Sequence, residues 1–137
     1  MILISHRGNL NGPSDLENHP TQIKKVLDLG YDCEIDLWCE YGRFFLGHDT
    51  PEYCIHPTFL DRKGLWIHCK NLEALNACSA NQNYFWHEKD SYTLTSNNYI
   101  WTFPNQKVGK KSIIVDNSEN WQSKNYDCFG VCSDYII

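Results

Sequence analysis

The chain has 137 residues, a net charge of -5 at neutral pH, and a composition that is 42% hydrophobic and 21% charged. This length allows one core, so we expect a single domain over residues 1–137. The acidic balance argues against a nucleic-acid surface, because such surfaces need clustered Lys and Arg. No stretch is long and apolar enough for a membrane-spanning helix, and the N-terminus lacks the basic region of a signal peptide.

The cysteines are the second compositional feature. There are seven of them. They form no CxxC pair and leave one over, which argues against a disulfide framework. We therefore expect buried free thiols in a reducing compartment, and a cytoplasmic protein.

Short apolar runs bounded by turn residues recur along the chain and predict eight strands. These strands span residues 2–5, 31–38, 43–46, 65–69, 84–86, 99–101, 112–115 and 129–133. Helical spacing predicts helices over residues 20–29 and 71–80, and a third helix that begins at Ser118. The turn-rich stretches 90–98 and 104–111 are expected to be loops.

Strands that alternate with helices indicate an α/β fold with a parallel sheet. Eight strands favour a minimal (β/α)8 TIM-type barrel, a fold that usually takes about 250 residues. In a chain this short, several outer helices must be shortened or missing. The strand faces that this leaves exposed predict a homo-oligomer that covers them.

Two acidic residues lie two positions apart in the otherwise apolar segment 33–37. On a strand, Glu34 and Asp36 share one face, while Cys33, Ile35 and Leu37 share the other. Neighbouring buried carboxylates repel each other unless a proton or a cation lies between them, and a hard cation such as Mg²⁺ or Ca²⁺ would serve. An edge strand with one solvated face would show the same spacing.

Three further segments place polar residues at the ends of expected strands. His6 and Arg7 follow the first strand, and offer an acid–base group and a guanidinium suited to phosphate. His48 is followed by Asp49, which can orient the imidazole. His68 and Lys70 close a fourth strand on one face.

Taken singly, each of these segments is also what an ordinary strand end with solvated polar residues would show. Together they bring seven such residues to the ends of four successive strands. In a barrel, these strand ends form the catalytic face.

The order of these motifs resembles the glycerophosphodiester phosphodiesterase family, in the superfamily of phospholipase C-like phosphodiesterases. The motifs are His6-Arg7-Gly8, Glu17-Asn18, Glu34-Ile35-Asp36, His48-Asp49 and His68-Cys69-Lys70, followed by a softer match at Gly130-Val131-Cys132-Ser133-Asp134. The resemblance is specific over residues 1–70 and weaker beyond them.

The resemblance implies metal-dependent cleavage of a glycerophosphodiester or a similar small phosphodiester. His6 and His48 would be the acid–base pair, and Glu34 and Asp36 would hold a divalent metal ion, Mg²⁺ or Ca²⁺ in this family. Arg7 and Lys70 would bind the phosphate.

One position departs from the family pattern. Where the family has an acidic metal ligand, this chain has His68. An imidazole ligand would shift the preference toward Mn²⁺ or Zn²⁺, or would weaken the site. We also expect His87 and Trp101, which lie at or after later strands, to line the pocket, although Trp101 could equally be a core residue.

Two alternatives stay open at this point. The first is a catalytically idle barrel that binds a phosphorylated small molecule, which the change at His68 favours and the two retained histidines oppose. The second is a lyase similar to phosphatidylinositol-specific phospholipase C or sphingomyelinase D. The absence of a signal peptide or apolar anchor disfavours a membrane substrate for it.

Overall fold

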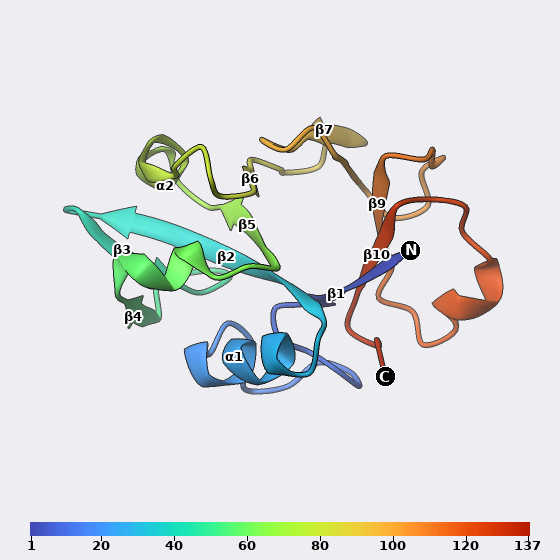
Figure 1. Ribbon diagram of the computed structural model, residues 1–137, viewed down its shortest axis with the longest axis horizontal. Coiled ribbons are helices and arrows are strands. Elements are labelled where there is room, and N and C mark those ends of the chain that lie inside the picture. Colours follow the sequence, from blue (N-terminus) through green and yellow to red (C-terminus); the bar gives the residue numbers. More distant parts are fainter.

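The computed structural model describes residues 1–137 and contains ten strands in one curled sheet (Figure 1). The strands are β1 (Ile2–His6), β2 (Asp32–Glu40), β3 (Arg43–Leu46), β4 (Tyr53–Ile55), β5 (Leu65–Cys69), β6 (Tyr84–Phe85), β7 (Tyr92–Leu94), β8 (Ile100–Thr102), β9 (Ser112–Val115) and β10 (Gly130–Ser133). The helices are α1 (Pro20–Asp28) and α2 (Leu72–Ala77), with 3-10 helices η1 (Pro57–Asp61) and η2 (Trp121–Lys124).

Seven strands of this sheet run parallel, in the order β6-β5-β2-β1-β10-β9-β8. The first strand of the chain therefore pairs with the last. At one end β7 is antiparallel to β8, and at the other β6 pairs only with β5, so the sheet stays open as a half-barrel. The hairpin β3–β4 extends the C-terminal half of β2 in antiparallel fashion.

The expected (β/α)8 TIM-type barrel is therefore wrong. Only α1 and α2 are α-helices, and the helix expected to begin at Ser118 is a 3-10 helix of four residues. A crossover between parallel strands needs about ten or more residues to include a helix. The later connections fall short of this or contain turn residues, as in the segment 103–111 between β8 and β9. The later strands are therefore parallel but are connected without α-helices.

Two strands were not predicted, and one predicted strand runs in another direction. β4 was not predicted, and β7 falls in the turn-rich stretch 90–98. The strand predicted over residues 43–46 exists as β3, but it is the return arm of a hairpin, because Tyr41 and Gly42 both have positive φ angles and turn the chain back.

The two faces of the sheet bury different sets of side chains. The outer face packs against the helices through a cluster that includes Ile23 and Val26 of α1 and Ile35 and Leu37 of β2. The inner face fills the curl with Ile4, Trp66, Phe85, Trp101, Ile113 and Cys132. On the same inner face, the side chains at the C-terminal ends of β1 and β5 and in the first half of β2 are polar, namely His6, His68, Glu34 and Asp36.

Strand register brings these polar residues into line. His6 of β1 is paired with Glu34 of β2, and Asp36 of β2 is paired with His68 of β5. Residues paired in register point to the same face of a sheet. The expectation that Glu34 and Asp36 share a face is thus confirmed, and the face is the buried inner one.

The hairpin returns to the same place. β2 continues beyond Asp36, turns, and comes back as β3, so that the backbone N–H of Gly47 donates to the carbonyl of Asp36 at 3.1 Å. The carbonyl of Gly47 accepts from the indole Nε1 of Trp38 at 2.7 Å. His48, the next residue, is thereby carried to the end of the parallel strands although β3 itself is antiparallel.

Gly47 has no room for a side chain, and this gives a first prediction. A Cβ at this position would overlap the carbonyl oxygen of Thr50. We expect Gly47→Ala to lower the free energy of unfolding by about 3 kcal/mol, measured by urea titration. Gly109→Ala is the matched control, because a Cβ there meets nothing within 4 Å. Equal stability of the two variants would contradict the close approach of the Thr50 carbonyl to Gly47.

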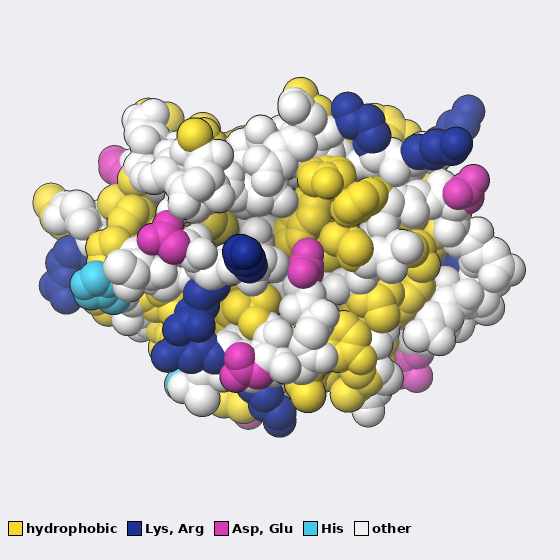
Figure 2. Space-filling model, in the orientation of Figure 1, with side chains coloured by type: hydrophobic (Ala, Val, Ile, Leu, Met, Phe, Trp, Pro, Cys, Tyr) yellow, Lys and Arg dark blue, Asp and Glu magenta, His cyan; other side chains and the backbone are white.

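The surface shows where apolar side chains remain outside the core. Figure 2 shows one face on which apolar side chains gather near the middle, with basic and acidic side chains interspersed around them. Leu16, Leu72 and Leu94 are all largely exposed. The homo-oligomer that would cover such surface stays a prediction. Neither helix is long and apolar enough to cross a membrane.

Candidate active site

A cleft of about 440 Å³ opens at the C-terminal ends of the parallel strands. It gathers all of the residues predicted from sequence to form the site except Asp36, which lies fully buried below it. The lining residues are His6, Arg7, Glu34, His48, His68, Lys70, His87, Glu88, Lys89, Trp101, Phe103, Pro104, Val115 and Asn117. Residues from four separate segments of the sequence, predicted to form one site, thus lie together in one cleft.

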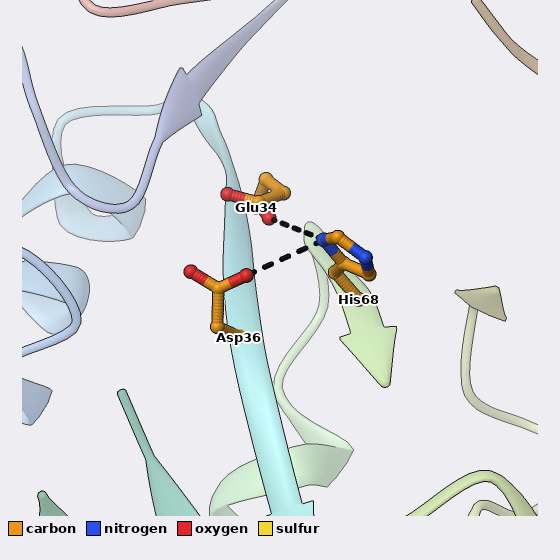
Figure 3. Close-up of side chains that lie close together, drawn as sticks. All are labelled: Glu34, Asp36 and His68. Carbon is orange, nitrogen blue, oxygen red and sulfur yellow. Dashed lines mark ion pairs between the residues drawn. The ribbon is translucent and has the colours of Figure 1, made fainter. Parts of the chain in front are cut away.

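The cleft contains one cluster able to hold a metal ion. Glu34 and Asp36 project from β2 and His68 projects from β5, and the three side chains point toward one another (Figure 3). The Nδ1 atom of His68 lies 3.3 Å from Oδ1 of Asp36 and 3.6 Å from Oε2 of Glu34. One ligand atom from each residue lies within 4.8 Å of the other two.

Asp36 is held in place from the opposite side. Its Oδ2 atom accepts a hydrogen bond from the Nδ2 of Asn18 at 2.9 Å and lies 3.3 Å from the Nε of Arg7. The Oδ1 atom of Asn18 accepts from the backbone N–H of Asp36, so the two residues are locked together. Burial raises the pKa of Asp36, but His68, Arg7 and Asn18 outweigh it and hold the pKa well below its ordinary value.

His68 is oriented by its second ring nitrogen. Its Nε2 lies 2.7 Å from the backbone carbonyl of His87, which can only accept, so Nε2 carries the hydrogen. A neutral His68 therefore presents the lone pair of Nδ1 to the two carboxylates. Burial lowers the pKa of His68, but the carboxylates of Asp36 and Glu34 outweigh it and raise the pKa to about 9.

This donor set fits a divalent metal ion. The Oε1 atom of Glu34 and the Oδ1 atom of Asp36 are buried and accept no hydrogen bond, which is costly for carboxylate oxygens unless a cation meets them. A histidine that donates its other N–H to a carbonyl is the usual arrangement for an imidazole ligand. In the metal-free protein, a proton on His68 balances the same two carboxylates.

His6 lies on β1, which pairs with β2 on the side away from β5. Its ring contacts Asp134, near the C-terminal end of the chain. Its Nδ1 is 2.8 Å from Oδ1 of Asp134, and the same oxygen accepts from the Nδ2 of Asn9 at 2.9 Å. Burial lowers the pKa of His6, but the hydrogen bond to Asp134 and the charge of Glu34 outweigh it and raise the pKa above its ordinary value. This is the arrangement of an oriented acid–base imidazole.

Arg7 sits at a strained turn directly after β1. It has φ 58°, the left-handed region that non-glycine residues rarely adopt, and Gly8 follows at φ 91°. Its guanidinium lies within ion-pair distance of Glu17 (3.5 Å) and Asp36. The strain is the kind that persists at functional sites, where surrounding contacts hold it.

The remaining predicted residues line the cleft at different depths. His48 is 41% exposed in its side chain, and its Nδ1 lies 2.7 Å from Oδ1 of Asp49. Lys70 follows β5 and is half-buried. Trp101 is almost fully buried, because its ring stacks on Phe85 at 4.4 Å, and Phe85 in turn stacks on His68. Trp101 therefore offers the cleft only a small part of its surface.

Three contributors were not assigned roles from the sequence. Asp134 was noted only as part of the last motif, and Asn9 and Asn18 were given no role. Asn9 and Asn18 are both almost fully buried, and Asn18 has φ 62°. The signals that could have marked the two asparagines are the position of Asn9 directly after the HRG motif and of Asn18 within the Glu-Asn motif, since buried amides must find hydrogen-bond partners.

Comparison with known proteins identifies no relative. No family model matches the chain, and no curated protein and no solved structure does.

Proposed function

We propose that the protein is a metal-dependent phosphodiesterase that cleaves a glycerophosphodiester or a similar small phosphodiester by acid–base catalysis with two histidines. The observation that carries the proposal is the buried cluster of Glu34, Asp36 and His68 at the floor of a cleft that also contains His6 and His48. The order of motifs that resembles the glycerophosphodiester phosphodiesterase family supports the same reaction class.

The two histidines would divide the proton transfers. In hydrolysis, a bond forms between phosphorus and the attacking water, and the bond from phosphorus to the leaving alkoxide breaks. His48 takes a proton from the attacking water, and His6 gives one to the leaving alkoxide. The raised pKa of His6, held up by Asp134, suits it to the acid role at neutral pH.

The phosphoryl group needs positive charge around it. Arg7, Lys70 and Lys89 line the cleft, and would bind its oxygens. Glu34, Asp36 and His68 would hold the divalent ion, which when bound neutralises charge on the phosphoryl oxygens. Because one of the three ligands is an imidazole, Mn²⁺ or Zn²⁺ suits the set better than Mg²⁺ or Ca²⁺.

A generic substrate tests the proposal. The measurement is hydrolysis of bis-p-nitrophenyl phosphate by metal-stripped protein, with Mg²⁺, Ca²⁺, Mn²⁺ or Zn²⁺ added back singly. Turnover that requires a metal and is lost in both His6→Ala and Glu34→Ala is the expected result. Glu119→Ala, on the surface and outside the cleft, is the control for handling and folding.

His68 gives a second prediction, on metal preference. His68→Glu supplies a third carboxylate in place of the imidazole, and hard cations prefer oxygen ligands. We expect the ratio of Mn²⁺ to Mg²⁺ affinity to fall at least about tenfold, measured by equilibrium dialysis. An unchanged ratio would show that His68 does not ligate the ion.

A catalytically idle protein that binds a phosphorylated small molecule is the second candidate. The contact that favours it is His68 between the two carboxylates, since a protonated imidazole there can take the place of a metal ion at neutral pH. Folded protein that turns over no phosphodiester with any metal, yet binds inorganic phosphate in a manner that requires Lys70, would support this alternative.

A further inference from the structure

Two cysteine side chains meet on the outer face of the sheet, the face opposite to the one that carries His68 and Lys70. The Sγ atoms of Cys69 and Cys78 are 3.8 Å apart, within hydrogen-bond distance for sulfur. Cys69 is the last residue of β5 and is buried, whereas Cys78 caps the C-terminus of α2 and is partly exposed. The two thiols thus combine a buried partner with one that solvent can reach.

We propose that Cys69 and Cys78 form a redox-active thiol pair that closes reversibly to a disulfide when the protein meets a peroxide. To form the disulfide, the two Sγ atoms need only move closer together from a separation of 3.8 Å. Both residues end their secondary-structure elements, so side-chain rotation and a slight shift of the C-terminus of α2 can supply it.

The chemistry balances with hydrogen peroxide as the oxidant. The Cys78 thiolate attacks one peroxide oxygen, the O–O bond breaks, and Cys78 becomes a sulfenic acid as hydroxide leaves and takes up the thiol proton. The Cys69 thiol then attacks the Cys78 sulfur and displaces water. In total, two thiols and one peroxide give one disulfide and two waters.

The order of attack follows from the surroundings of the two thiols. The hydrogen bond with Cys69 outweighs burial and lowers the pKa of Cys78, which favours its thiolate. Cys78 is also the more accessible of the pair. Cys33 and Cys132 differ in both respects, since they are fully buried and burial raises the pKa of each.

The disulfide would fix both ends of α2 to the sheet. Its N-terminal end is already attached, because Asn71 donates to the carbonyl of Cys39 at 2.9 Å and accepts from the N–H of Cys39 at 3.2 Å. A bond from Cys78 to Cys69 would attach the other end. Cys69 lies between His68 and Lys70, so oxidation changes the stiffness of the strand end that carries both cleft residues.

The test reads the thiols directly and does not depend on the proposed function. Reduced wild-type protein is treated with stoichiometric hydrogen peroxide, its remaining thiols are alkylated, and it is digested with trypsin. Cleavage after Lys70 separates the two cysteines into peptides 64–70 and 71–89, each with one cysteine. The expected product is these two peptides joined, lighter by two hydrogen atoms and released by dithiothreitol.

Two variants sharpen the result. Cys78→Ser is expected to yield no joined peptide, and Cys54→Ser, which removes an exposed thiol without a sulfur partner, is expected to yield it as the wild type does. The proposal is overturned if folded wild-type protein keeps both Cys69 and Cys78 alkylated while Cys54 is oxidised. It is equally overturned if Cys78 proceeds to a sulfinic acid with Cys69 still free.

Discussion

His6→Asn is expected to lower kcat/KM for metal-dependent phosphodiester hydrolysis by about 10²–10⁴-fold, the usual contribution of one acid–base group. His6 is largely buried, oriented by Asp134 through Nδ1, and paired in register with Glu34, so its ring has one defined place in the cleft. Asparagine keeps a polar group of similar size near Asp134 but carries no transferable proton. The measurement is steady-state kinetics with the best metal at neutral pH.

A variant of Asp134, the hydrogen-bond partner of His6, tests the acid role of His6 independently. Asp134→Asn removes the carboxylate that raises the pKa of His6, so the limb of the pH–rate profile that reports the acid should move to lower pH. The loss of activity should then be smaller at acidic pH than at neutral pH. A His6→Asn protein that is folded, binds metal and retains wild-type kcat/KM would refute the acid role.

The positions of most strands follow from the sequence, whereas the overall architecture does not. The runs predicted at residues 2–5, 65–69, 112–115 and 129–133 match β1, β5, β9 and β10 closely, because each is an apolar run bounded by turn residues. What a local pattern does not contain is the direction of pairing. The sequence of β2 and β3 predicts two successive strands without giving their relative direction. The turn at Tyr41 and Gly42, where both φ angles are positive, is what makes the two strands antiparallel.

Chain length correctly predicted that outer helices would be shortened or missing, but it did not predict that the sheet would stay open. Connections such as 103–111 cannot carry a helix and two turns. The sheet therefore stops at β6 and β7 and stays open, and side chains such as Phe85 and Trp101 fill the curl across the opening.

Predicted site residues come together even though the predicted fold was wrong. The cleft depends on strand ends and register, which β1, β2, β5 and the hairpin provide without a closed barrel. The contacts that escaped prediction are long-range. Nothing near His6 in sequence points to Asp134, which lies at the other end of the chain and reaches it only because the first and last strands pair.

The metal-free protein is expected to lose stability as pH rises through about 9, because its folded state then loses the proton on His68. The folded pKa of His68, about 9, lies above the ordinary value of 6.5. A pKa raised on folding stabilises the protein fully below the unfolded value, and this stabilisation disappears above the folded value. The shift corresponds to at most about 3 kcal/mol in the free energy of unfolding.

The measurement compares urea unfolding with chelator present at about pH 6 and about pH 10. Other groups also titrate over this range, so the matched variant is His68→Gln, which keeps a donor for the carbonyl of His87 but cannot take up a proton. The difference between the two pH values should be smaller in His68→Gln by most of the expected free energy. Parallel curves for the two proteins would mean that His68 is not the proton that balances Glu34 and Asp36, and the case for a metal ion in the same place would lose its electrostatic basis.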